Sequence, residues 1–145
     1  MNENPPATPP PVVYWTVWGS LFLSALLYLG ILELGLLGDS EEPAPEEAAD
    51  RTLAVALGLA GLFCGVVSVG VGYVVKNFRD AEGRKKTPAW SFTAFIIAVA
   101  LAETPAVFGL VLGLVGHGSG DYLPLFVVAV LALLLNRPGV YLPRG

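Results

Sequence analysis

Four apolar stretches follow one another along this chain, separated by polar connections. The first three run from Val12 to Leu37, from Leu53 to Val75 and from Ala89 to Val115, and the fourth runs from Tyr122 to Leu135. Each of the first three exceeds the roughly 20 residues that an α-helix needs to cross about 30 Å of hydrocarbon. The pattern therefore predicts three membrane-spanning helices.

The fourth stretch is shorter than a usual spanning helix and contains Pro124 near its start. It could cross where the bilayer is locally thin, or by including residues Gly118 to Asp121. A re-entrant or interfacial segment is the alternative. We favour a full crossing, which makes the fold an all-α, polytopic membrane bundle of four helices, with a single membrane domain from residue 12 to residue 145.

The composition agrees with a membrane protein. Of the 145 residues, 54% are hydrophobic and 14% are charged, and the mean hydropathy of +0.67 is too high for an ordinary soluble domain. Residues 1–11 contain five prolines and no Lys or Arg, which predicts a disordered segment. They lack the basic start of a secretory signal, so we expect the first apolar stretch to be retained as an anchor.

Basic residues are distributed unevenly among the connections. Lys and Arg near helix ends stay in the cytoplasm. The connection after Leu37 is acidic and holds Arg51 as its single basic residue, whereas the other seven basic residues lie after the second or the fourth stretch. With four spans, both termini and the basic connection face the cytoplasm. The seven are Lys76, Arg79, Arg84, Lys85, Lys86, Arg137 and Arg144.

The sequence offers little material for catalysis or metal binding. Cys64 and His117 are its sole Cys and His, which excludes a His/Cys metal cage and an intrachain disulfide. We interpret Cys64 as a small core side chain and His117 as an exposed loop residue. No Ser/His/Asp arrangement, phosphate-binding glycine loop or pair of catalytic carboxylates appears in a water-facing segment. We expect no enzyme activity, no cofactor and no nucleic-acid partner, with the lipid bilayer as the surroundings.

Small residues recur at steps of three or four on the second and third stretches, so each set lies along one face of its helix. Small residues let helix backbones approach closely, which is how helices associate in lipid. We therefore predict tight packing of these two helices, and the same surfaces could also serve neighbouring subunits. The predicted packing residues are Gly58, Gly61, Gly65, Ser68 and Gly72 on the second stretch, and Ala98, Ala102, Ala106, Gly109 and Gly113 on the third.

Glu103 stands near the middle of the third apolar stretch, where a charge costs at least about 2.5 kcal/mol. Apolar surroundings favour the neutral form of a carboxyl, and a carboxyl that gains and loses its proton there can carry one. Pro105 leaves the carbonyl of Leu101 without its helical partner and is expected to bend the helix beside the acid. We predict an ion-binding site of Glu103, Thr104 and Pro105. The alternative is a polar clasp between helices, worth about 1 kcal/mol.

The string from Phe95 to Val115, FIIAVALAETPAVFGLVLGLV, resembles the carboxyl-terminal helix of the proteolipid c subunit of rotary ATP synthases. That family places an Ala-Glu or an equivalent carboxylate at mid-membrane, followed by small residues and a Gly-Leu-Val run. The preceding glycine-striped stretch and charged connection resemble the rest of its hairpin, over residues of about 52–116. The resemblance implies that Glu103 is the proton- or sodium-binding carboxylate, and that the small residues of the second stretch form an inner-ring packing surface.

Two functions follow, and the sequence leaves both open. In the first, the protein translocates protons through Glu103 as part of a homo-oligomer. In the second, it is a noncatalytic scaffold or accessory subunit that binds other membrane subunits. The second is suggested by the connection KNFRDAEGRKKTP, which lacks the family's Arg-Gln-Pro signature, and by the first and fourth stretches, which have no counterpart in the two-helix form. A solute transporter fits less well because no inverted repeat is visible. We expect a multi-pass protein of a bacterial inner membrane.

Overall fold

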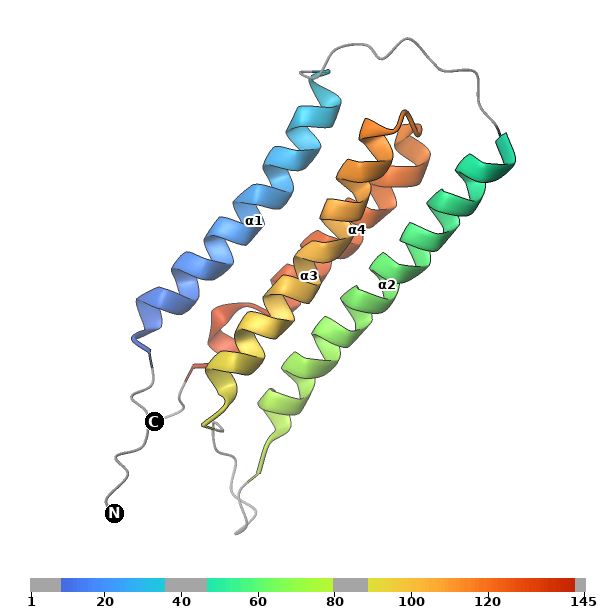
Figure 1. Ribbon diagram of the computed structural model, residues 1–145. Helices are drawn as coiled ribbons and strands as arrows, with labels where there is room; N and C mark the ends of the chain where they lie inside the picture. The colour runs from blue at the N-terminus through green and yellow to red at the C-terminus, as the bar shows by residue number, and fades with distance from the viewer. Residues whose placement is uncertain (1–8, 36–46, 80–88, 143–145) are drawn as a thin grey trace, which may run out of the picture.

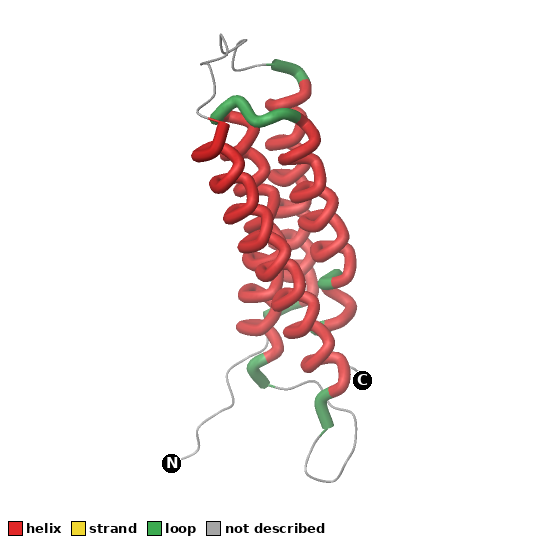
Figure 2. Tube along the Cα trace, turned by 90° about the vertical axis from the view of Figure 1, so that its right-hand side faces the viewer, coloured by secondary structure: helices red, strands yellow, loops and turns green. Residues whose placement is uncertain are grey.

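Four α-helices lie side by side in the computed structural model, which describes residues 9–35, 47–79 and 89–142 (Figure 1). Successive helices run in opposite directions along an elongated bundle, and the connections lie at its two ends (Figure 2). The elements are α1 (Pro11–Glu33), α2 (Glu47–Asn77), α3 (Ser91–Leu114), α4 (Ser119–Leu135) and the 3-10 turn η1 (Pro138–Val140).

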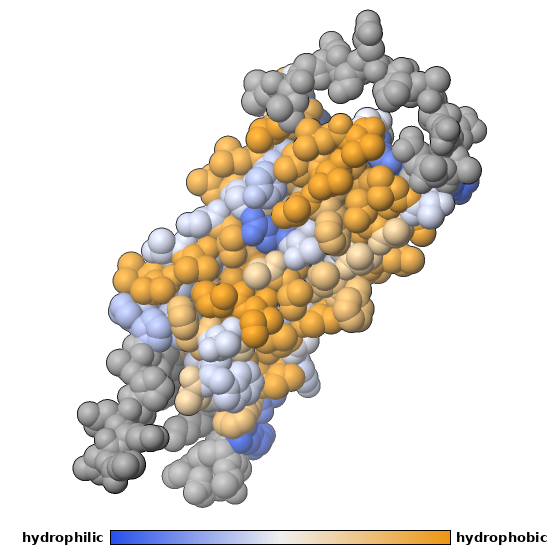
Figure 3. All heavy atoms as spheres, viewed as in Figure 1, coloured by the Kyte–Doolittle hydropathy of each residue, from blue (hydrophilic) through white to orange (hydrophobic). Residues whose placement is uncertain are grey.

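Three of the helices are long and apolar enough to cross a membrane: α1, α2 from Arg51 onward, and α3. Their large apolar side chains cover much of the outer surface, as Figure 3 shows for one face. In water such a surface would be unstable, whereas lipid solvates it. The predicted all-α membrane bundle is confirmed, and the protein is a multi-pass membrane protein.

The fourth helix passes along the bundle in one direction. It has 17 residues, a length of about 25 Å at 1.5 Å per residue. It starts beside the end of α1, where the Tyr122 hydroxyl donates to Glu33, and finishes beside the start of α1, where the Trp18 indole donates to the Leu133 carbonyl at 2.8 Å. This course agrees with a crossing, but α4 is shorter than the three helices that are long enough to span, so its crossing stays a prediction.

The helix boundaries differ from the apolar stretches at several ends. The first helix stops at Glu33, because Gly35 adopts the left-handed region at φ 59° and turns the chain away. The second begins earlier than the apolar pattern, at Glu47, and the fourth begins at Ser119, so it includes most of the Gly118–Asp121 segment. The segment predicted to be disordered, residues 1–11, lies outside the described residues up to residue 8, and Pro11 already begins α1. Most charges of the two long connections also lie outside the described residues.

The third helix is the centre of the bundle. It contacts α1, α2 and α4, and ten of its residues are buried. Ala98, Ala102 and Ala106 are fully buried, so neighbouring backbones can approach α3 closely. By contrast, the described part of α1 buries just Tyr14 and Ala25.

The small residues of α2 fit between α3 and α4 rather than against α3 alone. A Cβ at Gly61 would lie 2.8 Å from Leu125 of α4 and 3.4 Å from Pro105 of α3. Farther along, a Cβ at Gly65 would lie 2.7 Å from Val128 of α4. The absence of side chains at these two positions therefore lets α4 lie directly on α2.

Two of the predicted packing glycines lie elsewhere. Gly58 is half-buried, and a Cβ there would meet no described atom within 4 Å, because the amino-terminal turns of α2 project away from α3 (Figure 1). Gly113 faces Leu32 of α1 rather than α2, and a Cβ there would lie 2.5 Å from the Leu32 side chain. Gly113 thus packs against α1 rather than the expected α2, and the expectation of close packing at Gly58 is wrong.

A buried polar network joins α2, α3 and α4 near the end where α1 begins. The Ser68 hydroxyl donates to the Ala98 carbonyl at 2.8 Å and accepts from the Asn136 amide at 2.7 Å. The Tyr141 hydroxyl donates to the Asn136 side-chain oxygen at 2.5 Å. Ser68, Asn136 and Tyr141 are all fully buried. Because each bond satisfies a group that water cannot reach, the network fixes η1 and the end of α4 to the bundle.

Candidate functional site

Glu103 meets a hydroxyl from a helix that the proteolipid resemblance does not include. The Ser24 hydroxyl of α1 is hydrogen-bonded to Oε1 of Glu103, and both residues are half-buried. Each lies near the middle of its helix. The contact therefore lies halfway along the seam between α1 and α3.

The carboxyl is screened by α1 but is not sealed inside the protein. Glu103 is the single charged residue of α3, and it keeps part of its surface exposed beside Ser24. Figure 3 shows a largely apolar face interrupted by a small hydrophilic spot about halfway along the bundle. A polar group at this height can therefore reach the outer surface of the bundle through the seam.

The three residues of the predicted ion-binding site do not converge. Glu103 points to α1, whereas Pro105 is fully buried on the opposite face of α3, against Gly61 of α2. Two residues along an α-helix are about 200° apart, so this divergence follows from helix geometry. The Thr104 hydroxyl donates to the Ala100 carbonyl of its own helix at 3.0 Å. The structure thus groups Glu103 with Ser24, while α3 remains one helix through Pro105.

Two further hydroxyls lie on α1, one and two turns nearer its start than Ser24. Thr16 and Ser20 are exposed, and each donates to the backbone carbonyl four residues earlier. Side chains four residues apart share a helix face, so the three hydroxyls form a row that ends at Glu103. A hydroxyl that donates one hydrogen bond can still accept others.

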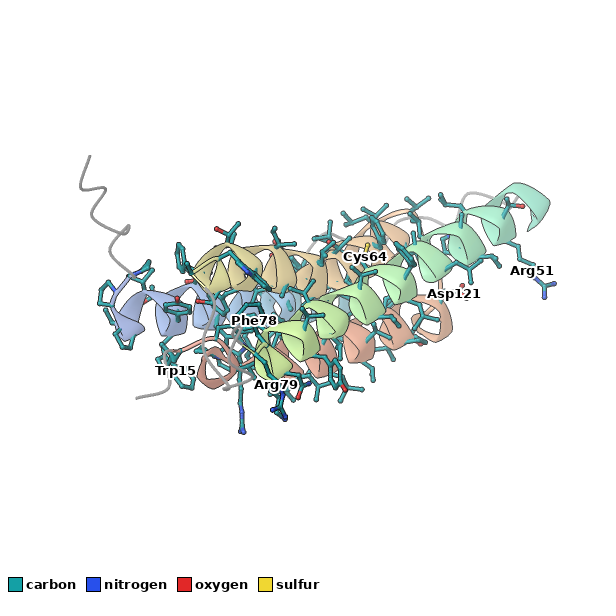
Figure 4. All side chains as sticks on the ribbon, turned by 90° about the horizontal axis from the view of Figure 1, so that it is seen from below. Trp15, Arg51, Cys64, Phe78, Arg79 and Asp121 are labelled. Atoms are coloured by element: carbon teal, nitrogen blue, oxygen red, sulfur yellow. The ribbon has the colours of Figure 1, made fainter. Side chains whose placement is uncertain are left out.

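The opposite end of the bundle has its own polar contacts. The Tyr122 hydroxyl donates to Glu33 Oε1 at 3.1 Å, and Glu33 is exposed. His117 Nδ1 lies 3.2 Å from Asp121 Oδ2, and the His117 side chain is 7% exposed. The expectation of an exposed His117 is wrong, since the residue is half-buried in the turn between α3 and α4. Cys64 is half-buried and not a core residue (Figure 4).

Sequence reasoning missed Ser24 and Asn136 as partners of predicted residues. Ser24 carried a usable signal, since hydroxyls at positions 16, 20 and 24 interrupt an apolar stretch at helical spacing. Asn136 directly follows the fourth stretch, and its position suggested a connection residue. Among the described residues, no group of three or more His, Cys, Asp or Glu side chains is arranged to hold a metal ion.

Comparison with known proteins agrees with the hairpin. The family model for the C subunit of ATP synthase matches residues 52–115, which confirms the resemblance for α2, the following connection and α3. The match covers less than half of the chain and leaves out α1 and α4. No curated protein and no solved structure matches the chain. The chain is therefore a small multi-pass membrane protein that contains a hairpin similar to that of the proteolipid family.

Proposed function

We propose that this protein carries protons across the membrane through Glu103, as part of an oligomer. The observation that supports this most directly is the hydrogen bond between Ser24 and Glu103 at the middle of the α1–α3 seam. An ionisable group at this depth is costly, and a polar partner at the same level lowers that cost.

The hydrogen bonds of Ser24 indicate how the proton is held. Its hydroxyl lies 3.0 Å from the Leu21 carbonyl and also contacts the Glu103 carboxyl. A hydroxyl has one hydrogen, and a carbonyl can accept but not donate. If Ser24 donates to Leu21, a protonated Glu103 can donate to the Ser24 oxygen in turn. The contacts are thus fully satisfied with a proton on Glu103.

The same hydroxyl can serve the ionised state. When Glu103 loses its proton, Ser24 can rotate and donate to the carboxylate, because a hydroxyl hydrogen turns freely about the C–O bond. Because Ser24 can hydrogen-bond to both protonation states, neither state is stabilised so strongly that Glu103 stops exchanging its proton. In this proposal Thr16 and Ser20 guide the proton toward Ser24 from the end of the bundle where α1 begins.

Proton flux in proteoliposomes tests the proposal. The purified oligomer is reconstituted, a potassium diffusion potential is imposed with valinomycin, and an internal dye reports pH. The Glu103→Gln variant should lose the flux, because an amide keeps the shape of the side chain but does not titrate. Glu33→Gln is the matched control and should conduct normally, since Glu33 lies at the exposed end of α1. Equal flux from the wild type and Glu103→Gln would overturn the proposal.

A second function is favoured by one separate observation. Two residues of the small-residue stripe of α2, Gly61 and Gly65, are buried under α4 of the same chain and are not open to a second copy. An accessory protein that binds unrelated membrane proteins fits this closed surface. Gentle detergent extraction followed by mass measurement separates the two: a homo-oligomer supports translocation, whereas a single copy held by other proteins supports the accessory role. In the latter case, reversing the charges of Arg84, Lys85 and Lys86 should release the partners.

A further inference from the structure

A hollow of about 420 Å³ lies at the end of the bundle where α1 begins. Its lining comes from α1, α2 and the turn after α4, and includes Trp15, Lys76, Arg137, Gly139 and Val140. The lining thus comes from three segments that are far apart in the sequence, and they meet because α4 returns to the start of α1. Figure 4 shows Trp15 at this end and Arg51 at the opposite end.

The hollow lies at the level where lipid headgroups are expected. Trp15 is in the second turn of α1, Lys76 is in the last turn of α2, and Arg137 follows the last residues of α4. Three helices thus leave the hydrocarbon at this level. Trp at a membrane boundary sits beside the headgroups, and basic side chains there meet lipid phosphates.

The lining combines two cations with apolar surface. Lys76 and Arg137 are exposed, and Trp15 is 50% exposed. Guanidinium binds phosphate oxygens through paired N–H groups, and an ammonium adds a point charge. Trp15 and Val140 offer apolar contact for the glycerol and upper acyl carbons. Gly139 leaves the hollow open, since a Cβ there would meet no described atom within 4 Å.

The site is held in place before any ligand arrives. Val140 N–H donates to the Arg137 carbonyl at 3.0 Å, and Tyr141 is anchored on Asn136. Arg137 therefore projects from a backbone that is fixed by the buried network. A fixed site loses less entropy on binding than a mobile one.

We propose that this hollow binds the phosphate headgroup of an anionic phospholipid, with Lys76 and Arg137 on the phosphate and Trp15 against the glycerol region. A free phosphate ester shares the charge but would gain nothing from the apolar side. The proposal is independent of proton transport, because the hollow lies at the bundle end and Glu103 lies at mid-depth.

Native mass spectrometry of the detergent-purified protein tests the site by titration with phosphatidylglycerol and with phosphatidylcholine. Phosphatidylglycerol should bind more tightly, and Lys76→Gln and Arg137→Gln should each weaken it about fivefold, the change that corresponds to about 1 kcal/mol per basic residue. Arg51→Gln removes a charge at the other end and should change nothing. Lys76→Arg and Arg137→Lys keep the charge and should retain most binding, which separates loss of the site from loss of the fold.

Three outcomes would overturn the proposal. The first is equal affinity for the two lipids, and the second is an equal effect of Arg51→Gln. The third is full displacement of phosphatidylglycerol by millimolar glycerol phosphate, which would show that the hollow recognises a soluble phosphate ester rather than a lipid.

Discussion

Gly61 of α2 and Leu125 of α4 approach so closely that a Cβ at position 61 would lie 2.8 Å from Cδ2 of Leu125. Gly65 and Val128 repeat the relationship one turn farther along, at 2.7 Å. The fourth helix therefore occupies the small-residue surface of α2 that the proteolipid resemblance assigns to packing within a ring. Any oligomer of this chain has to form through other faces, such as the exposed apolar sides of α1 and α2.

Alanine at these glycines should destabilise the bundle in a predictable order. Gly72→Ala should cost the most, about 1–3 kcal/mol, because its Cβ would lie 2.5 Å from Asn136 Oδ1 and 3.0 Å from the Tyr141 hydroxyl, which are held by the buried network. Gly61→Ala should cost less, since Cδ2 of Leu125 is the far end of a flexible side chain. Gly65→Ala should lie between the two, because Cγ1 of Val128 can move only by rotation about a stiff χ1. Gly70→Ala is the control, because a Cβ there meets no described atom within 4 Å. Thermal unfolding in detergent measures the stability of each variant. If Gly70→Ala lost as much stability as Gly72→Ala, the predicted order would be wrong.

Removal of the Asn136 side chain should loosen the end of α4. The Asn136→Ala variant leaves Tyr141 without its acceptor and Ser68 without a donor, and leaving buried polar groups unsatisfied costs about 1–3 kcal/mol each. Hydrogen exchange should then increase in η1 and the last turn of α4. Asn77→Ala is a suitable control, because Asn77 is exposed and its amide donates to the Tyr73 carbonyl of its own helix. Unchanged exchange in η1 would show that the network does not hold this end.

Variants at the Ser24–Glu103 contact should show whether a loss of proton flux reflects a loss of stability. Ser24→Ala removes an interhelical hydrogen bond and should cost about 1 kcal/mol, whereas Ser20→Ala, at an exposed position on the same helix, should cost almost nothing. Glu103→Gln should stay close to wild-type stability, because its amide can donate to the Ser24 oxygen. Thermal unfolding of the three variants checks this. Strong destabilisation by Glu103→Gln would mean that any loss of flux reflects loss of fold.

Labelling with a membrane-impermeant maleimide should establish the topology. In a Cys64→Ser background, Arg51→Cys should react in intact cells, while Asn77→Cys and Arg137→Cys should react only after permeabilisation. The expectation follows from the excess of basic residues at the end that holds positions 77 and 137. Reaction of position 137 from outside would show that α4 does not cross.

Stability should fall at high pH because of Tyr141. Burial raises the pKa of its phenol above the ordinary value. Above about pH 10 the unfolded chain loses this proton first, so the folded state binds more protons and its stability decreases as pH rises. The melting temperature should therefore drop from about pH 9 to about pH 11. In Tyr141→Phe the melting temperature should be lower at neutral pH, because the bond to Asn136 is lost, but it should decrease less steeply as the pH rises. An identical slope would assign the effect to other groups.

Local properties of the chain account for what could be predicted. The three long apolar stretches became α1, α2 and α3, because hydrophobicity over some 20 residues is enough to specify a helix in lipid. The glycines at 61, 65 and 72 were identified as a packing face by spacing alone, since side chains three or four residues apart share a face. The Ala-Glu at positions 102 and 103 carried the resemblance that the family comparison then confirmed.

Hydropathy along the chain was enough to predict which segments are helices, that they belong in a membrane, and that one carboxyl lies near the middle of its helix. The tertiary structure alone decided what that carboxyl touches: Ser24 is 79 residues away, and nothing in the local pattern states which helix packs on which face of α3. It also decided that α4 covers the glycines of α2 and that Trp15, Lys76 and Arg137 meet in one hollow. Hydropathy decides whether a single segment enters the membrane as a helix. Which helices pair, and which faces they turn to one another, depends instead on shape and hydrogen bonds between segments.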